Sequence, residues 1–549
     1  MFRETRSQTS LLESRFLVPP EKRARLEKSW ADAFRLRVLP LIDEEAFRSC
    51  YCEDNGRPNK SIRLIVGVLL LKEADDLTDA AAIESLEFNL LWHHALGVTP
   101  EEAHVAERTL NYFRRRLMEN GRAKAMFEQM TAALMKADGL SAVRQRLDST
   151  HVLSNIAVLT RLGLFVETVT NFLRELVKDA PTLVEGISEP IRKRYLEREG
   201  YFSDAKREVA QRRLPVVARD VFELVRTFEA DPLASRLASY ALLKRLLDEQ
   251  CEVTGETIEA PVRLREPKEI GGNTLQSPHD PDATYGHKGK GYELQLAETC
   301  VADNPYQVVT AMAVNGAHVS DQHATVPIVE DLATRNLRPD TLLADTAYSG
   351  GENIVVCAEL GTELLAPVQD PGASQSADPF LGEPTPAPHL SAADLGAFTF
   401  NATFDRVLTC PAGHAPDEQH IGENAFFATF SAERCATCPL ADGCAARRLA
   451  SGEHRLRWRD RAAATATRQR VQQTAAFKKA YRLRSGIEST NAELKGRHGA
   501  KKLRVRGEDR VTLALYLKTM ALNIKRAVRH HVRVLLDRLG GGPRCIPAL

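Results

Sequence analysis

The sequence contains no apolar segment long enough to span a membrane. Its longest apolar run, LIVGVLLL at residues 64–71, is far shorter than the roughly 20 residues that a bilayer requires. The first ten residues, MFRETRSQTS, lack the apolar core of a secretion signal, so we expect a cytoplasmic protein without membrane contact. No G-x4-G-K-[ST] segment is present, which disfavours an ATP-driven mechanism. Internal repeats are also absent.

The chain has almost no net charge, +1 overall, but its charges are unevenly distributed. Residues 441–549 hold 26 Lys and Arg against 8 Asp and Glu, a net charge of +18, and the first 440 residues carry −17. A strongly cationic C-terminal segment predicts contact with a polyanion, with an affinity that falls steeply as salt rises. The alternative is that this segment docks on the acidic remainder of the same chain.

With 549 residues, 43% of them hydrophobic and 27% charged, the sequence is typical of globular protein but too long for one core. We expect an α/β protein divided into several parts. The predicted parts are a helical N-terminal domain for DNA binding or dimerisation at 1–138, the first core strand at 139–157, a helical insertion at 158–280, the core continued at 281–370, a flexible linker at 371–399, a cysteine-containing insertion at 400–452, basic helices that complete the core at 453–530, and a tail at 531–549.

Two acidic residues lie in segments that predict strands of one mixed sheet. Residues 143–156 are rich in β-branched side chains without helical periodicity, which predicts a strand that contains Asp148. Residues 284–368 predict two antiparallel strands, a helix, a buried strand, a second helix and a last strand. Asp345 follows the buried run TLLA, at a strand end where open sheets bind ligands. Desolvation there makes an unpaired carboxylate costly, so Asp345 needs a cation nearby.

The stretch YRLRSGIESTNAELK, residues 481–495, predicts a helix with two different faces. At about 100° per residue, Tyr481, Arg484, Glu488 and Lys495 fall within an arc of roughly 60°, while the apolar side chains gather elsewhere. An ordinary solvated face with an i,i+4 ion pair is the simpler interpretation. The rest of the chain favours an active site instead, because Glu488 could join the two aspartates of the predicted sheet.

Three carboxylates, Asp148, Asp345 and Glu488, predict a site for Mg²⁺ or Mn²⁺. Hard divalent ions take oxygen ligands, and a pair of them can activate the attacking oxygen and stabilise the leaving oxygen of a phosphodiester displacement. Basic and aromatic side chains nearby would then hold DNA. The predicted DNA contacts are Tyr481, Arg484, Lys495, Trp458, Lys288 and Lys290.

Four of the ten cysteines form a cluster with the spacing C-x24-C-x2-C-x5-C. Thiolates at such spacing suit tetrahedral, structural Zn²⁺. The predicted ligands are Cys410, Cys435, Cys438 and Cys444, and His414 leaves a Cys₃His set open. The competing interpretation, that these cysteines are small buried residues, poorly explains why they gather beside a proline-rich linker.

Taken together, LDSTHV, LLADTAYSGGEN and YRLRSGIESTNAELK resemble the three acidic blocks of bacterial insertion-sequence transposases of the DDE type. The last block matches that family's Y-x2-R-x3-E-x6-K signature at every fixed position, and the second departs at Ala347, where glycine is commoner. The resemblance implies a ribonuclease-H-like catalytic core in which Asp148, Asp345 and Glu488 hold Mg²⁺.

The resemblance further implies double-stranded DNA as partner, both as terminal inverted repeats and as target, a homodimer on DNA, and association with the bacterial nucleoid. Two rival functions share the same core. One is an inactive or domesticated descendant that only binds DNA, and the other is a stand-alone nuclease that cuts without joining. A zinc-stabilised interaction scaffold would leave the face from Tyr481 to Lys495 unexplained.

Overall fold

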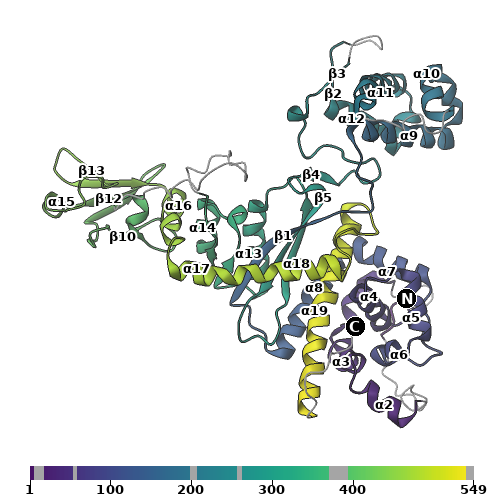
Figure 1. Ribbon diagram of the computed structural model, residues 1–549, viewed down its shortest axis with the longest axis horizontal. Helices are drawn as coiled ribbons and strands as arrows, with labels where there is room; N and C mark the ends of the chain where they lie inside the picture. The colour runs from purple at the N-terminus through teal and green to yellow at the C-terminus, as the bar shows by residue number, and fades with distance from the viewer. Residues whose placement is uncertain (5–17, 53–57, 198–206, 256–261, 370–392, 540–549) are drawn as a thin grey trace.

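The computed structural model describes residues 1–4, 18–52, 58–197, 207–255, 262–369 and 393–539. A mixed α/β core lies at the centre, and three lobes extend from it (Figure 1). The lobes are the N-terminal helices, a helical insertion after the first strand, and a small β-rich lobe that carries the clustered cysteines. No described helix is long and apolar enough to cross a membrane.

The central sheet is mixed, as predicted. β5 pairs antiparallel with β1, β4 and β6, whereas β7 pairs parallel with both β1 and β8. The antiparallel pairing of the two strands between 284 and 316 confirms that prediction. The strands are β1 (Arg144–Val152), β4 (Thr284–Gly286), β5 (Gly289–Thr299), β6 (Val309–Gly316), β7 (Thr341–Leu343) and β8 (Glu363–Leu365).

Side-chain alternation along β1 assigns its two faces to different cores. Leu147 and its partner Ala297 pack in a core with α13 (Thr325–Thr334), α14 (Gly351–Glu359) and α16 (Asp460–Val471). Because successive side chains of a strand point to opposite faces, Asp148 faces the other way, toward α18 (Gly486–Gly496) and α19 (Glu508–Arg538). The strand pattern therefore determines which helix Asp148 meets.

The N-terminal helices do not form a separate core. Their buried residues join one cluster with α18, α19 and the α18-facing side of β5, and the ammonium of Lys518 on α19 lies 2.7 Å from the carboxylate of Glu73 on α4. Lys72 pairs with the same carboxylate. These helices are α2 (Pro20–Leu26), α3 (Trp30–Arg37), α4 (Ile62–Ala74), α5 (Asp79–Phe88), α6 (Leu90–Leu96), α7 (Glu107–Glu119) and α8 (Arg122–Asp138).

A buried histidine makes this shared core sensitive to pH. His498, which follows α18, donates from Nδ1 to the carbonyl oxygen of Glu73 at 3.0 Å, and burial lowers its pKa to about 4. Since the unfolded chain has a histidine pKa near 6.5, it binds the extra proton first as pH falls. Stability is therefore lost between about pH 6.5 and 4, at a slope of up to about 1.4 kcal/mol per pH unit.

We expect His498→Gln, which keeps an N–H donor but cannot titrate, to be less sensitive to this pH change than the wild type. Urea unfolding at pH 7 and pH 5, followed by tryptophan fluorescence, measures the difference, because Trp30 and Trp92 are buried in the same core. An equal loss of stability in both proteins would contradict this role of His498.

The helical insertion has a hydrophobic core of its own. Phe172 packs against Phe228 and Tyr240, so three of its helices meet at one aromatic cluster. Its helices are α9 (Arg161–Asp179), α10 (Glu189–Arg192), α11 (Arg207–Phe228) and α12 (Ala238–Gln250), followed by the short hairpin of β2 (Cys251–Val253) and β3 (Val262–Leu264).

The structure corrects three of the predicted boundaries, two at the cysteine lobe and one at the C-terminal tail. Residues 454–458, expected within the basic helices, form β14 and pair with β12. Residues 393–399, expected in the linker, already fold with this lobe, whereas 370–392 lie outside the described residues. The tail was expected from 531, but α19 continues to Arg538. The lobe contains β9 (Thr399–Phe400), β10 (Val407–Thr409), β11 (Glu418–Ile421), β12 (Phe426–Phe430), α15 (Ala432–Ala436), β13 (Arg447–Arg448) and β14 (His454–Trp458).

Candidate active site

The two aspartates lie on neighbouring parallel strands of the sheet. Asp148 is in β1, and Asp345 follows the end of β7, the strand that pairs with β1. One oxygen of Asp345 accepts a hydrogen bond from the backbone N–H of Ala347 at 2.8 Å and so caps the short 3-10 turn Thr346–Tyr348. The turn is therefore kept although alanine replaces the commoner glycine. The other carboxylate oxygen of Asp345 accepts a hydrogen bond from Arg484.

The predicted helix of residues 481–495 is interrupted. α17 (Ala475–Tyr481) is followed by a 3-10 turn, Arg482–Ser485, and then by α18. This departure from an even 100° spacing matters because Arg484 lies in the turn. One nitrogen of its guanidinium contacts Asp148 at 3.0 Å and Asp345 at 3.2 Å. The other contacts Glu488 at 3.3 Å, so the three predicted carboxylates meet at a single cation.

Burial and neighbouring charges shift the pKa values of Asp148 and Arg484 in this cluster. Burial raises the pKa of Asp148, and the nearby carboxylate of Asp345 raises it further, although Arg484 opposes both. Burial alone would lower the pKa of Arg484, but Asp148 and Asp345 more than compensate and raise it. A carboxylate that remains hard to ionise beside an arginine is one that additional positive charge would stabilise.

Several polar residues of the site were not predicted from the sequence. Asn491, one turn after Glu488 on α18, donates to the second oxygen of Asp148 at 3.1 Å. Asp321, at the start of a short 3-10 turn, accepts hydrogen bonds from Ser149 and Gln295 beside the site. The spacing of Arg484, Glu488 and Asn491 on successive turns could have revealed Asn491. No local sequence signal marks Asp321.

The predicted DNA contacts other than Arg484 fall into two groups, those near the carboxylates and those that are used inside the protein. Lys495 is partly buried on α18, near Asp148 and Lys288, and burial lowers its pKa. Lys288 donates to Ser149 at 2.7 Å and lies 3.3 Å from Glu293. The ring of Tyr481 stacks on Phe477, with centroids 5.7 Å apart.

The other two predicted contacts are used inside the protein. Trp458 is 3% exposed, and its indole N–H donates to the carbonyl of Phe404 in the core of the cysteine lobe. The expectation that Trp458 lies among helical DNA contacts is wrong, since alternation along β14 turns its side chain inward. Lys290 donates to the carbonyl of Leu159 at 2.7 Å and is half-buried.

The clustered cysteines line a common cavity of about 30 Å³ in the cysteine lobe. Burial raises the pKa of the Cys435 thiol, and the neighbouring thiols add to this effect. As the side chains stand, no group of three or more His, Cys, Asp or Glu among the described residues is arranged to hold a metal ion. The cavity is lined by Cys410, His414, Cys435, Cys438 and Cys444.

Two parts of the chain match known protein families. Residues 409–528, which include Glu488, match a family described as a transposase DDE domain, and residues 23–116 match a transposase domain (DUF772). Both matches are to transposase families, and together they support a DDE-type insertion-sequence transposase. No curated protein and no solved structure matches it significantly.

The transposase is accordingly an enzyme that acts on DNA. Its two family matches lie at opposite ends of the chain and leave β1 and β7 unmatched. The structure links Asp148 and Asp345 to Glu488 through their contacts with Arg484, and it also links Asp148 to α18 through Asn491. That geometry uses three segments that are far apart in the sequence and adjacent in the fold.

Proposed function

We propose that this transposase cleaves DNA at the ends of its element and joins the new 3′-ends to target DNA. Asp148, Asp345 and Glu488 hold the catalytic Mg²⁺ or Mn²⁺. The observation that carries the proposal is the convergence of these three carboxylates on the guanidinium of Arg484. The mixed sheet, antiparallel from β6 through β5 to β1 and parallel from β1 through β7 to β8, supports a ribonuclease-H-like core.

The donor set fits a hard divalent ion. All three side chains offer carboxylate oxygens, which Mg²⁺ and Mn²⁺ prefer, and a bound cation would favour the ionised form of Asp148, whose pKa is raised by burial and by the neighbouring Asp345. Bound there, the ions would act as Lewis acids on the attacking and leaving oxygens of the phosphodiester. Asn491 orients Asp148, and the capped turn after β7 orients Asp345. Glu488 is the most exposed of the three acids and therefore the freest to adjust.

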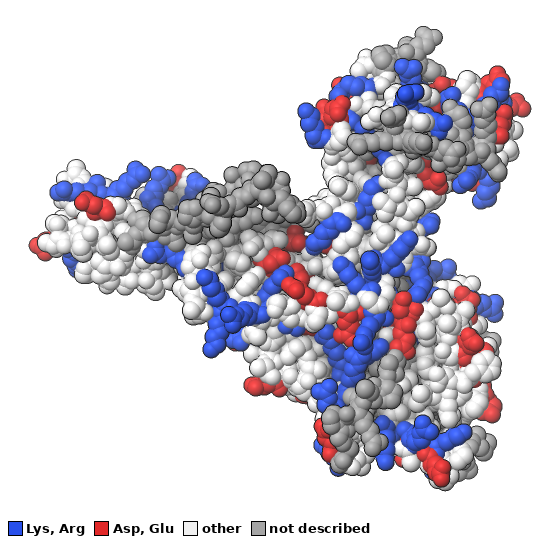
Figure 2. All heavy atoms as spheres, in the orientation of Figure 1, with Lys and Arg blue, Asp and Glu red and all other residues white. Residues whose placement is uncertain are grey.

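The surroundings of the site fit a DNA backbone. Lys and Arg side chains extend along α17 and α18 and down α19, with acidic side chains between them (Figure 2). We assign phosphate contacts to Lys495 and Lys288, which lie beside the carboxylates, and to Arg484 once bound metal takes over its role there. Terminal inverted repeats as substrate, a homodimer that joins the two ends, and a place in the nucleoid belong to the same proposal.

A strand-transfer assay tests this function. Purified protein is incubated with labelled double-stranded DNA carrying the element ends, an unlabelled target plasmid and Mg²⁺. We expect covalent joining of the labelled 3′-ends to the plasmid, and none with EDTA. Cutting without joining would identify a stand-alone nuclease. Binding of the ends without cutting would identify a catalytically inactive descendant.

We also propose that the cysteine lobe binds one structural Zn²⁺. The observation is that four thiols and the ring of His414 line one cavity, held by turns in which Cys410 and Cys435 accept backbone hydrogen bonds from residues two or three positions later. Thiols with a raised pKa stay protonated at neutral pH unless a cation shares their site, so zinc binding would release protons. Cys₄ and Cys₃His ligation both fit this cavity.

A further inference from the structure

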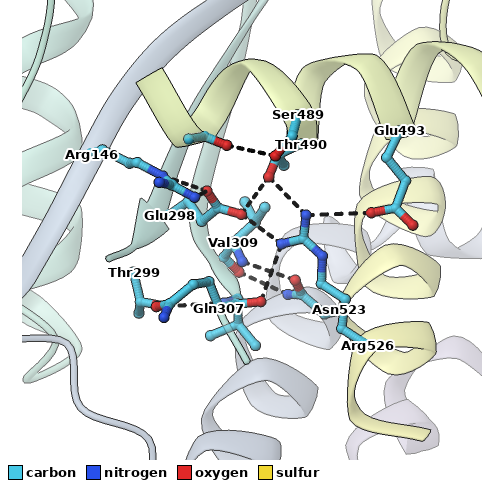
Figure 3. A network of polar contacts seen from close by, with 12 residues as sticks. Arg146, Glu298, Thr299, Gln307, Val309, Ser489, Thr490, Glu493, Asn523 and Arg526 are labelled. Carbon is cyan, nitrogen blue, oxygen red and sulfur yellow. Dashed lines mark hydrogen bonds and ion pairs between the residues drawn. The ribbon is translucent and has the colours of Figure 1, made fainter. Parts of the chain in front are cut away.

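A buried carboxylate lies behind the active site and is used by none of the steps above. Glu298 on β5 is fully buried, and both of its oxygens are occupied. One accepts from Arg146 at 2.7 Å, and the other accepts from the hydroxyl of Thr490 on α18 at 2.6 Å and from Arg526 on α19 at 2.5 Å. Figure 3 shows this carboxylate between the sheet and the two helices.

The network reaches the active site through Arg146. Besides binding Glu298, its guanidinium donates to the carbonyl of Leu483 at 3.0 Å. Leu483 lies in the 3-10 turn directly before Arg484, the residue on which the three carboxylates converge. Arg146 therefore fixes the position of that turn, because the same guanidinium is bound to the buried carboxylate of Glu298.

Gly486, the first residue of α18, lies very close to the guanidinium of Arg146. A Cβ atom built on Gly486 would lie 1.9 Å from the Nη1 atom of Arg146. A free arginine could swing away, but Glu298 and Leu483 hold this one on two sides. The backbone of Gly486 has ordinary helical dihedral angles, so glycine is needed here for space and not for conformation.

Strand geometry places the network and Asp148 on the same face of the sheet. Arg146 lies directly opposite Glu298 in the β1–β5 pair, and Asp148 is two residues farther along β1 on the same face. Thr490 attaches α18 to the same carboxylate, two residues after Glu488. Glu298 thus holds both β1, which carries Asp148, and α18, which carries Glu488.

We propose that Glu298, through Arg146 and Thr490, is a positioning residue that sets Arg484 and Glu488 against Asp148 and so tunes the affinity of the site for divalent metal. The inference rests on the proposed function. Partners behind metal ligands commonly change metal affinity by about 10–100-fold when they are replaced. Glu298 contacts neither the metal nor DNA in this scheme.

The test uses Gly486→Ala, with Gly496→Ala as its matched control. Both changes add one methyl group to α18, but a Cβ on Gly496 would meet nothing within 4 Å, and its φ is not in the left-handed region. Direct replacement, Glu298→Gln, would remove the buried carboxylate that the partly buried guanidinium groups of Arg146 and Arg526 share, and could unfold the protein. Gly486→Ala keeps every charge.

The readout is binding of Mn²⁺ to the DNA-free protein, measured by the electron paramagnetic resonance signal of free Mn²⁺, together with thermal unfolding. We expect Gly486→Ala to raise the Kd for Mn²⁺ about tenfold or more and to lower the Tm, because Arg146 must shift, while the protein is still folded at the temperature of the binding measurement; Gly496→Ala should leave both unchanged. Strand transfer by Gly486→Ala should recover at high Mn²⁺ concentration.

Two results would overturn the inference. If Gly486→Ala binds Mn²⁺ like the wild type while Glu488→Gln binds it weakly, the metal site stands and the positioning role of Glu298 is wrong. If the wild type and Glu488→Gln bind Mn²⁺ equally, the proposed metal site itself is wrong, and the inference fails with it.

Discussion

Glu488→Gln is expected to reduce excision of a marker by about 10³-fold or more while the protein still folds and binds DNA. The marker lies on a plasmid between the DNA ends that flank this gene, and excision is counted in cells. The size follows from losing several kcal/mol of charge stabilisation at a metal-dependent phosphoryl transfer, at about 1.4 kcal/mol per tenfold in rate. Glutamine keeps the shape of glutamate but not its charge.

The fold should not depend on this carboxylate. Glu488 is 64% exposed, and among the described residues it pairs with Arg484, which keeps both aspartates as partners in the variant. Glu352→Gln is the matched control, because Glu352 is also an exposed glutamate that is paired with an arginine, Arg461, at 3.0 Å. We expect it to excise normally.

Excision by Glu488→Gln at the wild-type level would contradict a catalytic role for this residue. If neither protein excises while both bind the ends, the copy is an inactive descendant that retains only its DNA-binding surface. The two results separate an error about the residue from an error about the function of the chain.

The sequence was sufficient to predict the main features of the catalytic region. β-branched composition predicted the strand that carries Asp148, and a buried run predicted the strand before Asp345; both strands are present. These features depend on local patterns, which a single sequence carries. The three acids are separated by up to 340 positions, so their proximity could be anticipated only from the resemblance. In the structure, all three contact the guanidinium of Arg484.

What the sequence could not supply depends on contacts between distant segments. Glu298 is one of many acidic residues in the sequence, and only the packing of β5 against α18 and α19 buries it between two arginines. Trp458 lies among arginines and was assigned to a DNA surface. Those arginines alternate with His454, Leu456 and Trp458 along β14, so the pattern is that of a strand with one buried face.

Removing zinc from the cysteine lobe is the second change with a large expected effect. We expect wild-type protein to contain one Zn²⁺ per chain, and Cys438→Ser to lose it and to become protease-sensitive between residues 393 and 458. The free energy of metal binding is also folding free energy in such a lobe, and for small zinc domains it amounts to about 10–16 kcal/mol. Its small core, with Phe398, Phe430 and Trp458, offers little else to replace it.

Metal analysis and limited proteolysis measure this effect, with Cys52→Ser as control, because Cys52 is an exposed cysteine outside the cluster. An unchanged zinc content in Cys438→Ser would rule out the site. His414→Ala distinguishes the two ligand sets, since zinc is retained if the site is Cys₄ and lost if His414 is a ligand. Residues 409–528 hold most of this lobe as well as Glu488, so an unfolded lobe with intact Mn²⁺ binding would show that the three acids are positioned without it.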